Sequence, residues 1–359
     1  MKKLNTTSLR PGMVTAEDVY SFNNQLILPK GLTLTDKTIT KLEFYSILSI
    51  RIEDDAIEPE AAAPSPDISY SERIKASPEF QQFKAEFEAD TAHFKDALND
   101  VVERGAPLNV DTLMSQTASL ISNAQDSSVN IFDMLHNLRD YDDSTYIHCM
   151  NVALICNVFA RWLRLSDEEI KLATLSGLLH DIGKTILPEE IVKKPNKLTD
   201  TEYNIIKTHT KEGYKILQNQ PISDHIKQAA LLHHERCDGT GYPFGLHDAQ
   251  IDSYAKLVCI ADVYDAMTSA RIYRGPLCPF TVIGIFENEG LHKYDTHFIM
   301  TFLENVVSTY LQNRVRLSNG MEGEIVYINK HRLSAPTVKC GDQFIDLSAK
   351  RDITIESLI

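Results

Sequence analysis

The 359-residue sequence has no apolar run approaching the roughly 18 residues that suggest a membrane-spanning helix, so we expect no membrane span. Residues 1–7 have no apolar core after their lysines, which excludes the pattern of a signal peptide. The sequence also has no excess of lysine and arginine over aspartate and glutamate. Its net charge of -14 argues against a general surface for DNA, RNA or anionic membranes. These absences together predict a cytoplasmic protein whose contacts with any anionic ligand are local.

The six cysteines form no Cys-x-x-Cys pair, which argues against a zinc knuckle. Most of them lie in apolar helical patterns, so we expect buried, reduced thiols rather than disulfides. The proportions of hydrophobic (43%) and charged (24%) residues are ordinary for a globular protein. A chain of this length can hold one domain of about 200 residues and smaller modules.

The pattern along the chain predicts four parts and a mainly α fold. Residues 1–57 have the turns and short strands of a small N-terminal α/β module. Residues 58–125 begin as a Pro/Ala-rich linker and continue as a helical connector, whose phenylalanines at helix spacing favour a structural stripe, with helix pairing or dimerisation left open. Residues 126–312 are helical almost throughout. Residues 313–359 alternate as strands, with a hairpin turn at Asn319-Gly320, and predict a small C-terminal β-barrel-like module.

The dipeptide His180-Asp181 lies at the end of a predicted helix that begins with a capping box of Ser166 and Glu169. Gly183 is expected to close this helix as a C-cap glycine. A buried carboxylate at the end of a mostly apolar helix is costly unless its charge is compensated. Taken alone, the pair is explained equally well by a capping or internal hydrogen bond and by metal ligation.

Other histidines and acids lie on apolar helical faces in the same region. One such histidine is by default an ordinary hydrogen-bonded core residue, but seven inward residues are too many for separate core positions. They are His148, His180, Asp181, His209, His233, His234 and Asp262. Imidazole and carboxylate ligands without thiolate suit manganese, iron, cobalt, nickel or zinc, and seven ligands suit two ions bridged by a carboxylate. Such a pair predicts a phosphohydrolase.

The motifs resemble the HD phosphohydrolase superfamily over roughly residues 130 to 305. His148, His180-Asp181 and Asp262 look like its H…HD…D signature. The longer pattern resembles the HD-GYP branch, with His180-Asp181-Ile182-Gly183-Lys184, then His233-His234-Glu235-Arg236-x-Asp238-Gly239-x-Gly241-Tyr242-Pro243, then Asp262-x-x-Asp265 and Arg271-x-Tyr273-Arg274.

The resemblance implies an all-helical domain that hydrolyses cyclic di-GMP to linear pGpG and, in some members, GMP, by attack of a hydroxide that bridges two metals. It implies two divalent transition-metal ions, iron or manganese ahead of nickel, cobalt or zinc. The first ion would be held by His148, His180, Asp181 and Asp262, and Asp181 would bridge to a second held by His209, His233 and His234. Lys184 would stabilise charge on the phosphorane. Arg271 and Arg274 would hold the substrate phosphates, and Tyr242 would shape the substrate loop and contact a guanine.

Three positions depart from the family pattern. Ser144 stands where some relatives place a glutamate that holds a third metal, so we predict two metals. Cys237 stands where tryptophan is common, and Ile272 where proline is common, which leaves loop packing and substrate preference open.

Several alternatives to hydrolysis of cyclic di-GMP remain at this point. They are hydrolysis of another nucleotide such as cyclic GMP-AMP, and a cyclic dinucleotide sensor without turnover. All seven predicted ligands and Lys184 are present, which favours an enzyme over a sensor. A homodimer or a signalling-protein partner is compatible with the sequence.

Overall fold

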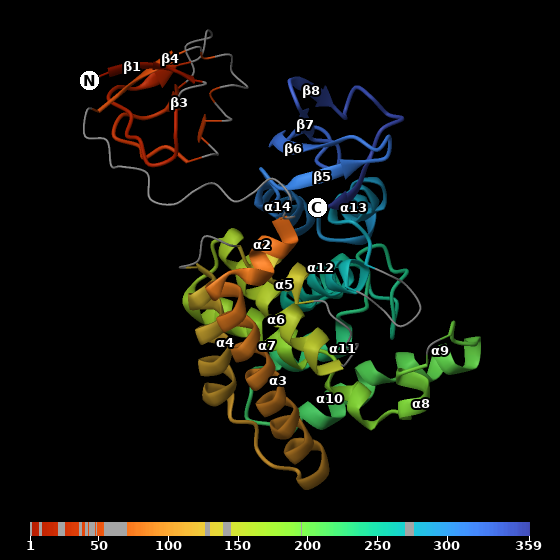
Figure 1. The fold of residues 1–359 in the computed structure, drawn as a ribbon. Helices are drawn as coiled ribbons and strands as arrows, with labels where there is room; N and C mark the ends of the chain where they lie inside the picture. Colours follow the sequence, from red (N-terminus) through yellow and green to blue (C-terminus); the bar gives the residue numbers. More distant parts are fainter. Residues whose placement is uncertain are drawn as a thin grey trace.

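The computed structural model describes residues 2–6, 9–20, 26–35, 38–39, 42, 47, 49–53, 70–125, 130–138, 145–194, 196–269 and 276–359. These residues form a body of helices, with short strands before it in the chain and a small sheet after it (Figure 1). The predicted mainly α fold with small flanking modules is confirmed.

The helices of the body follow one another along the chain with short connections. They are α2 Tyr70–Ala76, α3 Pro78–Arg104, α4 Val110–Gln125, α5 Ile131–Asn137, α6 Thr145–Trp162, α7 Asp167–Leu179, α8 Glu189–Val192, α9 Asp200–Lys207, α10 His209–Leu217, α11 Asp224–Leu232, α12 Ser253–Thr268, α13 Pro279–Lys293 and α14 Thr296–Thr309. Two short 3₁₀ helices, η2 Ile182–Ile186 and η3 Asp248–Gln250, lie between them.

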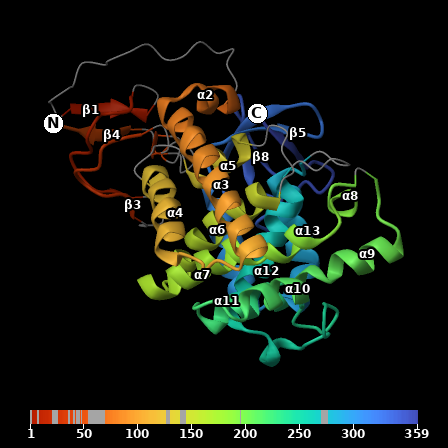
Figure 2. The same cartoon turned by 90° about the horizontal axis from the view of Figure 1, so that it is seen from below.

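Helix α6 lies at the centre of the body, with the other helices around it in both views (Figures 1 and 2). Its residues from His148 to Asn157 are all buried. A helix that is apolar on every side is buried on every side. Helices α6, α7 and α12 contact one another, so two consecutive helices meet a third from much later in the sequence at one place in the core.

Capping residues set where α7 and α9 begin, and the capping box predicted at Ser166 and Glu169 is confirmed. The backbone N–H of Ser166 donates to the carboxylate of Glu169 at 2.8 Å, while the Ser166 hydroxyl accepts the N–H of Glu169. Thr199 and Glu202 repeat this exchange at the start of α9. Each pair satisfies backbone donors that the first helical turn leaves free.

The end of α7 differs from the sequence prediction. The helix ends at Leu179, with His180 as a right-handed C-cap residue, and Gly183 lies inside η2. The predicted role of Gly183 as a C-cap was therefore wrong. A Cβ atom on Gly183 would lie 2.0 Å from the carbonyl oxygen of His209, so glycine allows the backbones of η2 and α10 to touch. This contact fixes His209 beside His180-Asp181.

The apolar stripe of α3 is buried within the same chain. Its members are Phe80, Phe83, Phe87, Phe94 and Leu98, each at most 3% exposed. Helix α3 packs against α4, α6 and η2. The stripe is structural, as the sequence pattern favours, and these side chains are not available for pairing with a second copy.

The C-terminal module is a five-stranded antiparallel sheet. Its strands are β5 Arg314–Leu317, β6 Glu322–Tyr327, β7 Thr337–Cys340, β8 Gln343–Asp346 and β9 Ile355–Leu358. The β5–β6 hairpin turns at Asn319-Gly320 as predicted, with φ of +83° at the glycine. The strand order is β8-β7-β6-β5-β9. The outer strands β8 and β9 do not pair, so the sheet is open and is not the barrel that the strand pattern suggested.

The N-terminal module is described only in part. Strand β1 Lys2–Asn5 pairs with β4 Ser49–Ile52, and β2 Val19–Tyr20 pairs with β3 Leu26–Leu28, both antiparallel. Their apolar side chains form a cluster separate from the main core. The Pro/Ala-rich part of the linker lies outside the described residues. No helix within the described ranges is long and apolar enough to cross a membrane.

Candidate metal centre

The seven predicted ligands converge at the place where α6, α7 and α12 meet. Histidine and acid atoms gather there in two groups, and within each group the ligand atoms lie within 4.8 Å of one another. One group comprises His148, His180 and Asp262, and the other comprises Asp181, His209, His233 and His234. The elements that carry them are α6 for His148, the end of α7 for His180 and Asp181, the start of α10 for His209, the end of α11 for His233 and His234, and α12 for Asp262.

The carboxylate of Asp181 lies between the two groups. Its Oδ2 is 3.6 Å from Nε2 of His148 and 3.4 Å from Nε2 of His180. Its Oδ1 is 3.2 Å from Nε2 of His209 and 3.6 Å from Nε2 of His233. Each oxygen therefore faces one set of imidazoles, which is the arrangement that a carboxylate shared between two cations requires.

Backbone carbonyls set which ring nitrogen of three histidines faces the centre. Nδ1 of His180 donates to the carbonyl of Gly177 at 2.7 Å, and Nδ1 of His209 donates to that of Ile206 at 2.6 Å. His233 does the same with Ala229 at 3.0 Å. A neutral imidazole that donates from Nδ1 carries a lone pair on Nε2. The helix backbone thus prepares all three Nε2 atoms as acceptors or ligands.

These Nε2 atoms face each other rather than hydrogen-bond donors. Nε2 of His209 lies 3.3 Å from Nε2 of His233, so two lone pairs point at one another. Nε2 of His148, Nε2 of His180 and Oδ1 of Asp181 are buried without a hydrogen-bond partner. Unpaired buried polar atoms are costly, and a cation is what this set of acceptors lacks. Because the donors are nitrogen and oxygen without thiolate, the residues fit one or more divalent transition-metal ions.

Asp265 supports His148 from outside the two groups. Its Oδ2 accepts Nδ1 of His148 at 2.8 Å, and its Oδ1 accepts from the amide of Asn151 at 3.1 Å and the hydroxyl of Ser269 at 2.9 Å. Asp265 is 1% exposed. A carboxylate on the second ring nitrogen fixes the tautomer of a ligating histidine. The sequence motif includes Asp265 without indicating this role; its three-residue spacing from Asp262, which places both on one face of α12, was the available signal.

The charges of the centre perturb the pKa values of its members. Burial alone would raise the pKa of Asp181, but Lys184 and His180 hold it well below its usual range. Burial would lower the pKa of His180, but the adjacent Asp181 raises it well above its ordinary value. Burial lowers the pKa of His233 to about 4. His180 thus favours its protonated form next to Asp181, whereas His233 stays neutral and able to bind a metal.

Lys184 and Tyr242 lie at the edge of the centre. The ammonium of Lys184 donates to Oδ2 of Asp181 from η2. The ring of Tyr242 stacks on His234, with 4.6 Å between centroids. Lys207 lies 6.0 Å from the Tyr242 ring centroid and 5.1 Å from that of the exposed Tyr203. Cations and aromatic rings therefore alternate along one side of the centre.

The loop that carries Tyr242 is held by a buried acid. Glu235 is 2% exposed, and its carboxylate accepts the N–H groups of Phe244 at 2.7 Å and Leu246 at 3.0 Å. A Cβ atom on Gly241 would lie 2.4 Å from the Cα of Glu235, so this close turn requires glycine. The sequence motif indicates the loop but not the role of Glu235. The position of this acid, directly after two inward histidines, was the feature that could have indicated a buried role.

Some predicted residues cannot be placed. Arg271, Ile272 and Arg274 lie outside the described residues, as does Ser144, so their predicted roles stay predictions. Cys237 is described, and its backbone N–H donates to the carbonyl of Lys293 at 2.8 Å, which ties the loop to the end of α13.

The helical body of this chain is similar to known proteins. A family profile described as "HD domain" matches residues 109–298. "Cyclic di-GMP phosphodiesterase PA4108" of Pseudomonas aeruginosa is 36% identical over 206 residues, which cover 57% of this chain and 50% of that protein. "3'3'-cGAMP-specific phosphodiesterase 1" of Vibrio cholerae is 42% identical over 145 residues, which cover 40% and 34%. "Cyclic di-GMP phosphodiesterase" of Thermotoga maritima is 36% identical over 168 residues, 46% of each protein. The chain thus spans half or less of the length of these relatives.

Proposed function

This chain belongs to the HD domain family, and we propose that it is a metal-dependent phosphodiesterase that hydrolyses a cyclic dinucleotide. The observation that carries the proposal is the position of Asp181, with one carboxylate oxygen toward each group of ligand atoms. Two relatives named as cyclic di-GMP phosphodiesterases support cyclic di-GMP as the substrate, with linear pGpG as the first product and GMP as a second.

In this proposal the seven residues would hold two divalent ions, and Asp181 would contribute to both sites. Nitrogen and oxygen donors accept manganese, iron, cobalt, nickel and zinc, and the family resemblance places iron or manganese first. When bound, such a pair supplies a hydroxide near neutral pH and neutralises charge at both ends of an in-line displacement. We propose two ions rather than three, because Ser144 cannot supply the carboxylate that a third would need.

The side chains at the edge of the centre bind and orient the substrate. Hydrolysis joins the oxygen of one water to phosphorus, breaks one phosphorus–oxygen ester bond and leaves a proton on the departing oxygen. The ammonium of Lys184, held at Asp181, would stabilise the added negative charge on the phosphoryl oxygens. Tyr242, fixed against His234, offers a ring face for a guanine. By motif, Arg271 and Arg274 would hold the phosphates.

The test is metal content and turnover measured on the same anaerobically purified sample. We expect two ions per chain. We also expect conversion of cyclic di-GMP to pGpG, measured by ion-exchange chromatography of the products. The Asp181→Ala variant should lose bound metal and turnover together. No bound metal after anaerobic reconstitution would overturn the metal centre, and three tightly held ions would overturn the two-metal proposal.

A second candidate substrate is 3'3'-cGAMP, because one relative with 42% identity is named as specific for it. Side-by-side assays with both dinucleotides separate the candidates, and a strong preference for the mixed dinucleotide would replace our first choice. Two bound ions with no turnover of either would favour a sensor.

A further inference from the structure

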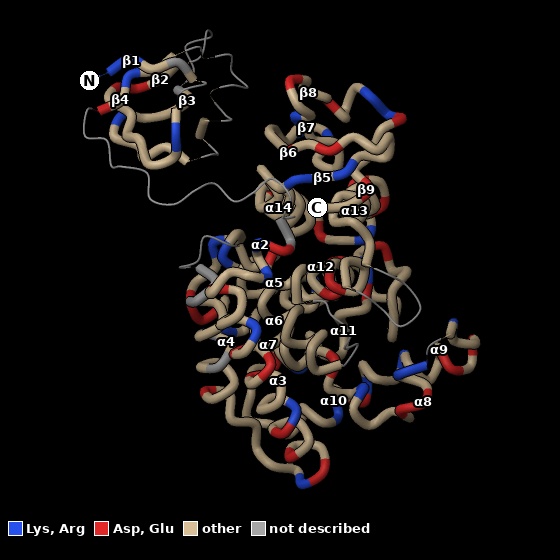
Figure 3. Tube along the Cα trace, viewed as in Figure 1, with Lys and Arg blue, Asp and Glu red and all other residues tan. Residues whose placement is uncertain are grey.

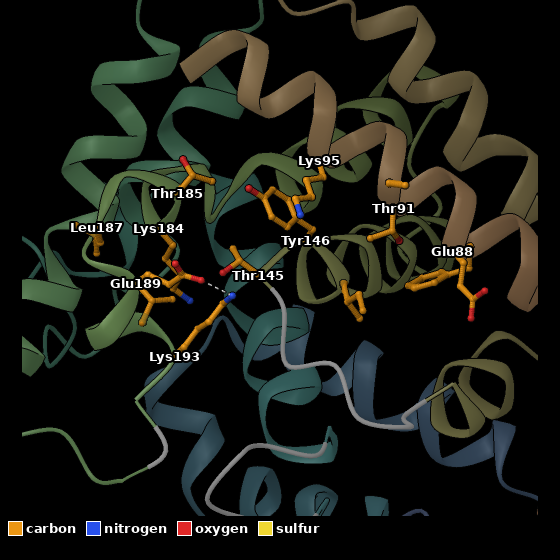
Figure 4. Close-up of a pocket in the computed structure, with 14 residues that line it drawn as sticks. Glu88, Thr91, Lys95, Thr145, Tyr146, Lys184, Thr185, Leu187, Glu189 and Lys193 are labelled. Carbon is orange, nitrogen blue, oxygen red and sulfur yellow. Dashed lines mark hydrogen bonds and ion pairs between the residues drawn. The ribbon is translucent and has the colours of Figure 1, made fainter. Parts of the chain in front are cut away.

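A cavity of about 580 Å³ lies beside η2 and the first turn of α6 (Figure 4). Its walls come from α3, the first turn of α6, η2 and α8. Lys184, whose ammonium contacts Asp181, is one of the lining residues. Helix α3 ends at Arg104, before the residues that the HD domain profile matches. One wall of the cavity therefore comes from the helical connector.

Helix α3 fixes the aromatic side of the cavity. The hydroxyl of Tyr146 donates to Oδ1 of Asn99 at 3.2 Å, and its ring meets that of Phe94 edge-on at 6.2 Å. Figure 4 shows Lys95 next to this ring, and its Nζ lies 5.8 Å from the Tyr146 centroid. Helix α3 thus supplies Lys95 and holds the ring of Tyr146, from the first turn of α6, at the wall of the cavity.

The lysines of the cavity differ in their partners. Lys193 pairs with Glu189 at 2.6 Å, and Lys184 pairs with Asp181. For Lys95, no described carboxylate lies within ion-pair distance, and the ammonium stands beside the cavity. The chain carries a net charge of -14, and Figure 3 shows acidic and basic positions interspersed along the coloured part of the helical body. Lys193 lowers the pKa of Glu189, which also lines the cavity, and the charge of Lys95 contributes to this shift, so Lys95 and Glu189 interact at longer range without an ion pair between them. A lysine placed in this way at a cavity of this size suits a small anionic ligand.

We propose that this cavity binds the half of the cyclic dinucleotide that is not being cleaved, with Lys95 at its phosphate and Tyr146 beside its base. The inference rests on the proposed function and adds a binding subsite to it. A cyclic dinucleotide carries two phosphates, and only one can lie at the metal centre at a time. The other half extends beyond the ligand set, and this cavity, which shares Lys184 with the centre, offers it a cation and a ring. Lys95 is then a substrate-binding residue supplied by a helix outside the family match.

The test compares two substrates on the metal-loaded full chain. Cyclic di-GMP has a second nucleotide, whereas bis(p-nitrophenyl) phosphate has a single phosphodiester and nothing to place in the cavity. Lys95→Ala should raise KM for cyclic di-GMP about tenfold, since it removes a charged contact, and leave kcat nearly unchanged. The constants for bis(p-nitrophenyl) phosphate and the metal content should stay within about twofold of wild type. Lys95→Arg should restore most of the loss.

Two further variants separate the subsite from general effects of charge and of folding. Lys171→Ala removes the same charge from α7, where Lys171 pairs with Asp111 at 3.3 Å away from the cavity, and should leave both substrates unaffected. Thr91→Trp fills the cavity from α3 and should reproduce the selective rise in KM. Circular dichroism melts of each variant check the fold.

The outcomes distinguish this inference from the proposed function. If Lys95→Ala changes neither substrate, or changes both equally, the subsite is refuted while the phosphodiesterase stands. If wild type hydrolyses bis(p-nitrophenyl) phosphate but not cyclic di-GMP, the proposed function fails. The subsite is then decided by inhibition of the first reaction by cyclic di-GMP: weaker inhibition of Lys95→Ala supports it, and equal or absent inhibition refutes it. Loss of product inhibition alone would make the cavity a product site and overturn the proposal.

Discussion

Asp265→Asn is the substitution that most directly tests how the centre is organised. Both carboxylate oxygens of Asp265 accept hydrogen bonds, one from Nδ1 of His148 and the other from Asn151 and Ser269. An amide replaces one oxygen with a donor. If the amide oxygen faces His148, then its NH₂ group meets the NH₂ group of Asn151. If the NH₂ group faces His148, then the imidazole must accept at Nδ1 and carry its proton on Nε2.

The second orientation removes His148 as a ligand, because a protonated Nε2 cannot bind a metal. The first orientation keeps the tautomer but loses the charge of the carboxylate and leaves buried donors in conflict. Loss of such a supporting carboxylate typically costs about 10- to 100-fold in metal affinity. This corresponds to about 1.4 to 2.8 kcal/mol. We expect the loss to concern one ion, because Asp265 touches only the group that contains His148.

The assay is anaerobic dialysis against graded EDTA, with ions per chain measured by mass spectrometry. In Asp265→Asn, one ion should leave at about 10- to 100-fold lower chelator concentration, and turnover should fall with it. The matched control is Asp252→Asn at the other end of α12. There Asp252 accepts from Nδ1 of the exposed His225 at 2.7 Å and also caps the helix, a task that asparagine performs equally well. The control should behave as wild type.

The reasoning is refuted if Asp265→Asn releases both ions at wild-type chelator concentrations. Equal weakening of both ions, together with a lower melting temperature, would instead show that Asp265 acts on the fold of the body and not on one imidazole.

Three further predictions follow from the same geometry. Asp181→Asn should reduce turnover by at least about a thousandfold, measured by product chromatography, because an amide cannot offer an anionic oxygen to both groups. Because Asp181 raises the pKa of His180, metal binding there must displace a proton, so metal retention should fall as the pH is lowered through the neutral range, as metal analysis after gel filtration would show. His233, whose pKa burial lowers to about 4, stays neutral above that pH and does not add to this loss. Gly183→Ala should destabilise the protein by about 1–3 kcal/mol in urea titration, since its Cβ would press on backbone, whereas Gly284→Ala in α13, with 3.4 Å to its nearest neighbour, should not destabilise it.

The sequence predicts well where a pattern is local. The capping boxes, the stripe of α3 and the β5–β6 hairpin each depend on residues a few positions apart, and the structure has all three. Which face of a helix points inward likewise depends on the spacing of residues a few positions apart. This is why histidines far apart in the sequence could be recognised as one set before their positions were known.

The predictions that were wrong or incomplete concern contacts between segments that are distant in the sequence. A glycine after a helix has the same local pattern whether it caps the helix or lets another backbone approach, and only the position of α10 decides for Gly183. Closure of a barrel depends on whether the first and last strands meet, which strand periodicity does not encode. The role of Asp265 requires His148, 117 residues earlier in the chain.

The orientation of the histidines couples metal binding to the stability of the helical body. Three backbone carbonyls hold the rings of His180, His209 and His233 so that their Nε2 atoms converge around Asp181. When no cation is bound, the body must either bury lone pairs that face each other or take up a proton there. The raised pKa of His180 means that this residue takes up a proton readily. A metal ion bound there would displace that proton and accept the facing lone pairs, so its binding energy would add to the free energy of unfolding. Since the predicted ligands come from α6, α7, α10, α11 and α12, that energy would join segments spread over more than a hundred residues.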